Sequence, residues 1–179
     1  YLIEKNSSNK ISLAIKNFKL KLTNKKIRFH YDQKLNLFFA TESSFKHYFG
    51  NRYRGYFLYT RGLRNRGKSI AASYSLNHIK FTENDLVIDC GANYADLWIY
   101  LQDKIKPNNY ITFEPGLEEH NCIKKNNING IHYNFGLGNK DTMFDLYQAS
   151  ERGDNSFLQP DKFTDIVSTQ MMTVTNWVE

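Results

Sequence analysis

Three short segments of this chain carry the residue types best suited to binding a small ligand. The first runs from Asp89 to Asn93 and reads Asp-Cys-Gly-Ala-Asn. Glu114 opens the second, 25 residues after Asp89 (114 − 89), and Asn134-Phe135 form the third. The glycine tolerates a positive φ and leaves bare backbone against which a ligand can lie. A carboxylate accepts two hydrogen-bond donors at once, and an aromatic ring stacks on a flat base.

Each segment lies at the end of an apolar run that is typical of a buried strand. These runs are residues 86–90, 110–113 and 130–135, and helices are expected over 97–101 and 117–127. Alternating strands and helices predict a mostly parallel sheet with right-handed crossovers. Because ligands bind at the carboxyl ends of such strands, we expect the three segments to form one site.

The spacing of glycines argues against a dinucleotide cofactor. Where such a fold has Gly-x-Gly-x-x-Gly, this chain has Gly91, Asn93 and Asp96. The second glycine lets a pyrophosphate approach closely, and Asp96 would repel it. A ligand without phosphates fits better, which predicts S-adenosylmethionine (SAM).

Within a SAM site, the residue types predict separate roles. Glu114 would accept hydrogen bonds from both ribose hydroxyls, and Asn134 with Phe135 would bind the adenine. Asp89 would hold the loop or the amino group of the ligand. The alternative for Glu114 is a purely structural charge that stabilises the N-terminus of the helix over 117–127.

Some positions are expected to face the core. These are Leu117, Cys122 and Ile123 in the second helix and Cys90 in the first strand. The two cysteines form neither a CxxC pair nor a disulfide framework, so a reducing, cytoplasmic environment is expected. The five histidines show no metal-ligand spacing, and no metal site is predicted.

The composition and charge of the chain indicate which kinds of partner are expected. The chain has 179 residues, 41% hydrophobic residues and a net charge of +6. The lysines are scattered and accompany a general excess of Asn, Ile, Tyr and Phe, so nucleic acid is not the expected partner. No apolar run long enough to span a membrane is present, and no signal peptide is visible. The chain starts at Tyr1 rather than Met, and we expect a fragment at both ends.

Residues 1–66 are interpreted as a basic and aromatic appendage or cap, and residues 67–179 as the ligand-binding domain. An apolar stripe at helical spacing comprises Ile11, Ile15, Phe18 and Leu22, with lysines around it. It indicates either a membrane-surface helix or, as we favour, a helix packed on its own domain.

The remainder of the appendage predicts two further features. Residues 25–40 are expected to form a hairpin that turns at 32–34. Residues 43–66 are rich in arginine and aromatic residues, which could clamp nucleic acid, cap a ligand cleft or simply pack. A short helix is expected over 69–76.

After the third strand, two further strands are expected over 143–148 and 167–174. Apolar and polar residues alternate in the first of them, which predicts an antiparallel pair at the edge of the sheet.

Several short motifs occur in one order and spacing. They are Val87–Asn93, Phe113–Pro115, Lys125–Asn127, Asn134–Gly138, Asp154–Ser156 and Val174-Thr175. Together they resemble the FkbM family of SAM-dependent methyltransferases, a class I Rossmann-like group, over about residues 63–179. The resemblance implies O-methylation of a hydroxyl on a sugar or a related small molecule or glycan.

The resemblance also implies roles for single residues. It assigns the SAM-binding residues Asp89, Gly91, Ala92, Asn93, Glu114, Asn134 and Phe135, and Asn155 and Ser156 as the acceptor-facing pair. The general base is left open among His120, Asp154 and residues beyond Glu179. The alternatives to this function are a nucleic-acid methyltransferase or binding protein and a non-catalytic Rossmann-like domain.

The chain departs from the family pattern at two places. Tyr94-Ala95 stand where family loops commonly have Ile-Gly. If Ala95 needs a positive φ, the cost is on the order of 1 kcal/mol, and Tyr94 is expected at the pocket mouth. The family also continues with a fourth parallel strand, before which this chain stops, so its C-terminal half is expected to be incomplete.

Overall fold

The computed structural model describes residues 2–148 and 155–179. The chain forms two compact units, one reaching to Ile79 and the other running from Lys80 to Glu179. Residues 67–79 belong to the first unit, whereas the sequence suggested a boundary after residue 66. Residues 67–73 continue the helix that begins at Leu63. The start of this helix is anchored to the first unit, because Glu42 Oε2 accepts a hydrogen bond of 3.1 Å from the Arg64 N–H.

The first unit is a three-stranded antiparallel sheet with helices. Its elements are α1 (Leu2–Leu22), β1 (Arg28–Asp32), β2 (Leu37–Glu42), β3 (Phe45–Phe49), α2 (Arg52–Tyr59), α3 (Leu63–Ser73) and a 3₁₀ turn (Leu76–His78). The strand order is β1-β2-β3, so the predicted hairpin is confirmed. Asp32 Oδ1 fixes its turn by accepting from the N–H groups of Lys34 and Leu35.

One face of this sheet forms the core of the first unit. Phe29 lies opposite Ala40 in the strand register. The Phe29 ring meets Tyr56 of α2 edge-on at 4.8 Å and Phe49 at 6.2 Å. Gly55 lies against the same Phe49 ring. Much of the aromatic segment 43–66 therefore packs inside the unit.

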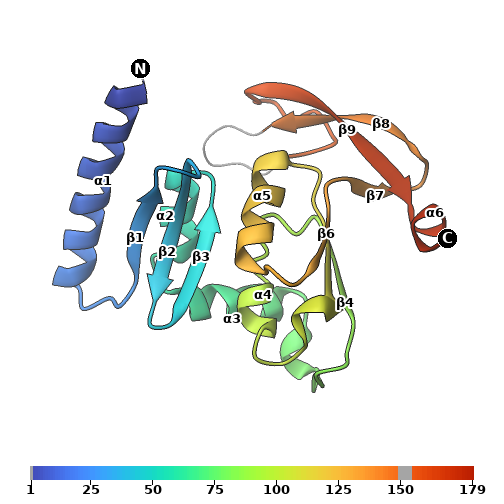
Figure 1. Ribbon diagram of the computed structural model, residues 1–179, viewed down its shortest axis with the longest axis horizontal. Helices are drawn as coiled ribbons and strands as arrows, with labels where there is room; N and C mark the ends of the chain where they lie inside the picture. The colour runs from blue at the N-terminus through green and yellow to red at the C-terminus, as the bar shows by residue number, and fades with distance from the viewer. Residues whose placement is uncertain (1, 149–154) are drawn as a thin grey trace. The chain divides into compact units, whose positions relative to one another are not determined.

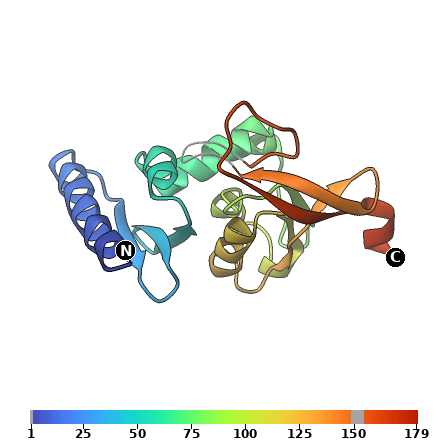
Figure 2. The same cartoon turned by 90° about the horizontal axis from the view of Figure 1, so that it is seen from above.

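Helix α1 forms as predicted and packs on its own unit beside β1, as Figures 1 and 2 both show. The packing face differs from the predicted stripe, because Leu13 and Leu20 are the buried residues in the part of α1 from Lys10 onward. Asn17 fixes the contact by bonding both the N–H and the C=O of Phe29 at 2.8 Å. The stripe that begins at Ile11 lies on the opposite, exposed face.

The second unit contains a parallel sheet and a mixed sheet. Its elements are β4 (Val87–Cys90), α4 (Trp98–Leu101), a 3₁₀ turn (Pro107–Asn109), β5 (Tyr110–Phe113), α5 (Leu117–Asn126), β6 (Ile131–Tyr133), β7 (Gly136–Gly138), β8 (Thr142–Gln148), β9 (Asp165–Thr173) and α6 (Val174–Val178). The strands β4, β5 and β6 are parallel, with β5 in the middle. The protein is thus a mixed α/β structure, as the alternation of elements predicted.

The predicted antiparallel pair exists, but it does not extend the parallel sheet. Strand β8 pairs with β9 along its whole length, and β9 also pairs in parallel with β7, in a separate sheet of order β7-β9-β8. The long β8–β9 ribbon is visible in orange and red in Figures 1 and 2. The Gly136-Leu137-Gly138 segment, which follows the third predicted strand, is the strand that starts this second sheet.

Ile88, Cys90 and Leu117 are exposed, although the sequence predicted buried positions for them. Strand β5 is buried throughout, whereas β4 alternates, so that Ile88 and Cys90 are exposed. Among the described residues β4 is an edge strand of this sheet, and its alternation shows that only one of its faces is covered. In α5, Cys122 and Ile123 are fully buried as predicted, but Leu117 in the first turn is exposed.

The substitution Gly55→Ala tests the packing of α2 on the sheet. An added Cβ would overlap the Phe49 ring, and that ring is fully buried and cannot move aside. We expect a loss of at least about 2 kcal/mol in the free energy of unfolding, measured by urea titration. The control is Ser69→Ala on the exposed face of α3, which should change stability by less than about 0.5 kcal/mol. Equal effects would contradict the packing.

Candidate functional site

The ends of the three parallel strands meet, as the sequence predicted. Beyond the regular ladder, the Gly91 N–H donates to the Phe113 carbonyl at 2.8 Å, and the Glu114 N–H donates to the Tyr133 carbonyl at 3.0 Å. These bonds align the loops that follow β4, β5 and β6. The predicted residues Gly91, Asn93, Glu114 and Asn134 consequently lie at one edge of the sheet.

The Glu114 carboxylate joins two of these loops. Its Oε2 accepts a hydrogen bond of 2.7 Å from the Asn93 N–H, and its Oε1 accepts one of 2.8 Å from the Gly116 N–H. Glu114 is only 5% exposed. Each oxygen has a second lone pair, so the carboxylate can hold the loops and still accept from a ligand. The bond to Gly116, the N-cap of α5, shows that the structural role considered for Glu114 is also present.

The loop after β4 is strained. Gly91, Asn93 and Ala95 have φ values of 74°, 53° and 59°. Asn is the residue that tolerates this region best after glycine, whereas Ala95 costs on the order of 1 kcal/mol there. The loop is secured by Asn126, whose Nδ2 donates to the Tyr94 carbonyl at 2.7 Å. Tyr94 is buried in the core, so the expectation that it lies at a pocket mouth is wrong.

The helix expected after this loop is only one turn long. Residues 93–97 form turns, and α4 comprises four residues. Ala92 itself is buried, and its N–H also donates to the Phe113 carbonyl, at 3.2 Å. A Cβ on Gly91 would have no atom within 4 Å. Open space therefore lies beside the Gly91 backbone, and the glycine is required there for its φ value alone.

Acidic groups surround Glu114. Burial raises the pKa of Glu114 to about 7, with smaller contributions from the Glu119 and Asp89 charges, while its two backbone hydrogen bonds oppose the shift. Burial also raises the pKa of Asp89, with Asp96 contributing, although the Tyr110 hydroxyl donates a hydrogen bond to the Asp89 carboxylate. Ionisation of Glu114 therefore places a negative charge beside other acidic groups, which makes it less favourable.

The two residues predicted to bind adenine make contacts within the protein. Asn134 is exposed and its Nδ2 donates to the Glu114 carbonyl at 2.9 Å and to the Pro115 carbonyl at 3.1 Å. The Phe135 ring lies 5.3 Å from both Phe113 and Tyr133. Both side chains thus support the loop that carries Glu114, and the Phe135 ring belongs to an aromatic cluster beside it.

The two residues predicted to face the methyl acceptor, Asn155 and Ser156, make contacts in different places. Asn155 lies at the site, since its Nδ2 is 3.0 Å from the position of a Cβ on Gly116. Ser156 instead pairs its backbone with Tyr147 and accepts a hydrogen bond from the Leu158 N–H. Asp154, one of the considered bases, falls outside the described residues.

His120, another considered base, lies in the first half of α5. It is buried, and burial lowers its pKa to about 4. Its Nδ1 is enclosed without a hydrogen-bond partner among the described residues. The imidazole is therefore neutral at pH 7 and only a weak base.

Sequence reasoning missed three contributors to this site. They are the Gly116 N–H, the Asn126 amide and the buried Glu119. The position of Glu119 could have been noticed, because it is the third residue of the helix after the N-cap Gly116, where Glu commonly caps a helix. Asn126 belongs to the Lys125–Asn127 motif, but its contact joins residues 32 positions apart, so the motif did not indicate what its side chain binds.

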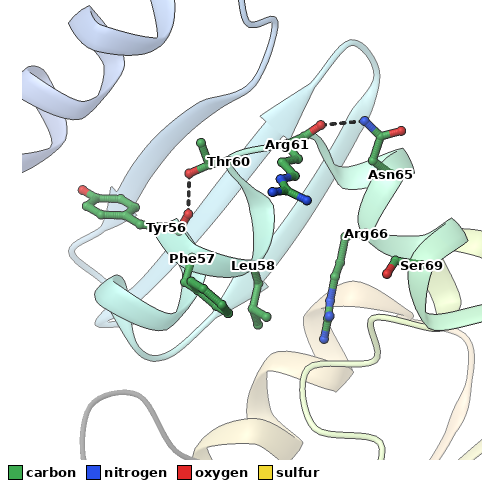
Figure 3. A pocket seen from close by; sticks show the side chains of 8 residues that line it. All are labelled: Tyr56, Phe57, Leu58, Thr60, Arg61, Asn65, Arg66 and Ser69. Carbon is green, nitrogen blue, oxygen red and sulfur yellow. Dashed lines mark hydrogen bonds between the residues drawn. The ribbon is translucent and has the colours of Figure 1, made fainter. Parts of the chain in front are cut away.

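The first unit has a pocket of its own, drawn in Figure 3. It measures about 750 Å³ and is lined by Tyr56, Phe57, Leu58, Thr60, Arg61, Asn65, Arg66 and Ser69. Asn65 Nδ2 holds the turn between α2 and α3 by donating to the Arg61 carbonyl at 2.7 Å. The Phe57 side chain is exposed. The pocket thus combines two arginines with an exposed ring.

Comparison with known proteins gives no identification: no family model, curated protein or solved structure matches this chain. In the part of the chain that the structure describes, no helix has the length and apolar content needed to cross a bilayer. Among the same residues, no three His, Cys, Asp or Glu side chains are arranged to hold a metal ion.

The substitution Glu114→Gln tests the electrostatics of this site. Folded Glu114 keeps its proton up to about pH 7, whereas the ordinary pKa is 4.5. The folded state therefore binds more protons at Glu114 between these values, so this group lowers the free energy of unfolding by on the order of 3 kcal/mol as the pH rises. Burial lowers the pKa of His120 to about 4, and this histidine contributes the opposite trend in both the native chain and the variant. The difference in unfolding free energy between the native chain and Glu114→Gln should therefore change by that amount between about pH 4.5 and pH 8 in urea titrations. Glu118→Gln, which removes an exposed acid on α5, should show no such change relative to the native chain, and a constant difference for Glu114→Gln would refute the shifted pKa.

Proposed function

We propose that the second unit binds SAM at the carboxyl ends of β4, β5 and β6. The observation that carries this proposal is the Glu114 carboxylate, which two backbone N–H groups hold in one orientation at the edge of a parallel sheet. Its remaining lone pairs suit two neighbouring hydroxyl groups such as those of a ribose. A hydroxyl donor would favour the ionised form and lower the pKa of Glu114.

The loop after β4 supports the same ligand. Gly91 leaves open space beside its backbone, which is the feature a ligand lying against the loop requires. Asn93 and Ala95 keep positive φ values despite their side chains, and such strain persists where the surroundings impose it. We interpret this loop as the wall along the amino-acid part of SAM.

Charge distinguishes SAM from phosphate-bearing cofactors. Asp89, Asp96, Glu114 and Glu119 are acids that are close enough to influence one another's pKa values. A pyrophosphate would meet repulsion from them, whereas SAM carries a sulfonium and an ammonium group that they attract. The absence of the second and third glycines disfavours a pyrophosphate for a separate, steric reason.

The proposed reaction is transfer of a methyl group to a hydroxyl oxygen. SAM would supply a methyl group on a positively charged sulfur, which is a good leaving group. Residues of the chain would align the acceptor oxygen with the methyl carbon. A base would receive the hydroxyl proton as the oxygen–methyl bond forms and the carbon–sulfur bond breaks. Asn155, beside the Gly116 backbone, is proposed to orient the acceptor. No base is assigned, since His120 is too weak a base to be favoured.

The acceptor class rests on the motif resemblance to the FkbM methyltransferases. We propose a hydroxyl on a sugar or a related metabolite. A nucleic acid is the second candidate acceptor, and the pocket of the first unit favours it, because Arg61 and Arg66 could contact phosphates and the exposed Phe57 ring could stack on a base. Methyl transfer to RNA rather than to sugars would support that candidate.

Calorimetric titration with S-adenosylhomocysteine tests the proposal, with NADH as the comparison ligand. We expect micromolar affinity for the first and none for the second. Glu114→Ala should weaken binding at least about tenfold, because each lost charge-assisted hydrogen bond costs roughly 1.5 kcal/mol or more. The control Glu118→Ala removes an exposed acid nearby and should bind as the native chain does. Absence of binding, or equal binding by Glu114→Ala, would reject the cofactor assignment.

A further inference from the structure

One face of α1 carries a continuous apolar stripe that nothing in the described structure covers. Ile11, Ile15, Phe18 and Leu22 are 63%, 53%, 62% and 69% exposed. Their spacing repeats every three or four residues, which places them on one face over roughly 17 Å of helix. Large apolar side chains singly exposed on a surface need no explanation, but an aligned row of four does.

The stripe is held outward by the packing of the opposite face. Leu13 and Leu20 are buried, and the Asn17 amide bonds both backbone groups of Phe29. Lys16 completes this anchor, since its Nζ lies 5.1 Å from the centre of the Tyr56 ring. Rotating α1 to bury the stripe would break these contacts, so its exposure is a property of the folded unit.

Lysines border the stripe on both sides. At 100° per residue, Lys19 lies on one flank and Lys10 with Lys21 on the other, and all three are exposed. Lys25 and Lys26 follow the helix, and no acidic residue occurs from Lys10 to Lys26. Long lysine side chains extend their charges away from an apolar surface while their stems cover it. The face therefore combines an apolar centre with a purely cationic border.

We propose that α1 is an interfacial helix that binds the surface of an anionic lipid bilayer. In this arrangement the stripe enters the boundary between headgroups and acyl chains, and the flanking lysines contact anionic headgroups. Apolar insertion and electrostatic attraction act together in such helices, and neither suffices alone. The helix lies in the plane of the membrane and does not span it.

A second copy of this chain is the less favourable occupant. The four stripe residues do have the spacing of a coiled-coil seam. However, Lys19 and Lys21 would then occupy the positions beside the seam, where they would face lysines of the other copy. Like charges at these positions oppose pairing, whereas an anionic surface is attracted by both flanks.

Vesicle flotation with the full 179-residue chain tests the proposal. The probes are vesicles of phosphatidylcholine alone and of phosphatidylcholine with roughly 30% phosphatidylserine. We expect binding to the anionic vesicles to be at least about tenfold stronger, and to weaken as salt is raised. The double variant Ile15→Gln/Phe18→Gln should lose binding at least about tenfold. Lys19→Gln/Lys21→Gln should lose the preference for anionic lipid.

Two control variants distinguish a loss specific to α1 from a general effect of removing exposed apolar or charged residues. Phe57→Gln/Leu158→Gln removes two apolar residues that are even more exposed than Ile15 and Phe18, and Lys68→Gln/Lys140→Gln removes two exposed lysines, all outside α1. Both controls should bind as the native chain does, and circular dichroism should show every variant folded. Failure to bind anionic vesicles, or equal losses in variants and controls, overturns the proposal. So does a lipid-free dimer in sedimentation velocity that Ile15→Gln/Phe18→Gln dissociates.

Discussion

The second unit depends on one buried carboxylate that ties two loops together. Glu114 accepts hydrogen bonds from the Asn93 N–H and the Gly116 N–H, and these groups belong to loops that follow different strands. A buried carboxyl group is costly unless it is hydrogen-bonded, so the two loops and the charge stabilise one another. The residual cost is visible in the pKa of Glu114, which burial raises to about 7.

The rest of the site follows from this interaction. The loop that brings the Asn93 N–H to the carboxylate takes positive φ values at Gly91, Asn93 and Ala95. Asn134 holds the other side by bonding the carbonyl groups of Glu114 and Pro115. The Glu114 carboxylate is therefore a preorganised hydrogen-bond acceptor beside the open space at Gly91. Both lie at the edge of the sheet where α/β proteins bind ligands. The proposal that a cationic ligand with ribose hydroxyls binds here rests on this combination.

The sequence predicted the parts of the fold that follow from local patterns. The three parallel strands, α5 and the hairpin of the first unit were all expected from periodicity and turn residues, and so was the convergence of Gly91, Asn93 and Glu114. The missed features depend on distant partners. Nothing local indicates that β4 is an edge strand with Cys90 exposed, or that α1 packs through Leu13 and Leu20 rather than through the longer apolar stripe. Likewise, β8 and β9 pair as predicted but join β7 in another sheet.

The most direct test of the account is to follow the Glu114 carboxyl carbon by ¹³C NMR across pH, without and with S-adenosylhomocysteine. The account predicts a pKa of about 7 in the free protein and a clear decrease on saturation, because ribose hydroxyls donating to the carboxylate favour its ionised form. A pKa near 4.5 in the free protein would contradict the buried, bridging carboxylate. A shifted pKa that the ligand leaves unchanged would contradict the role of Glu114 in binding SAM.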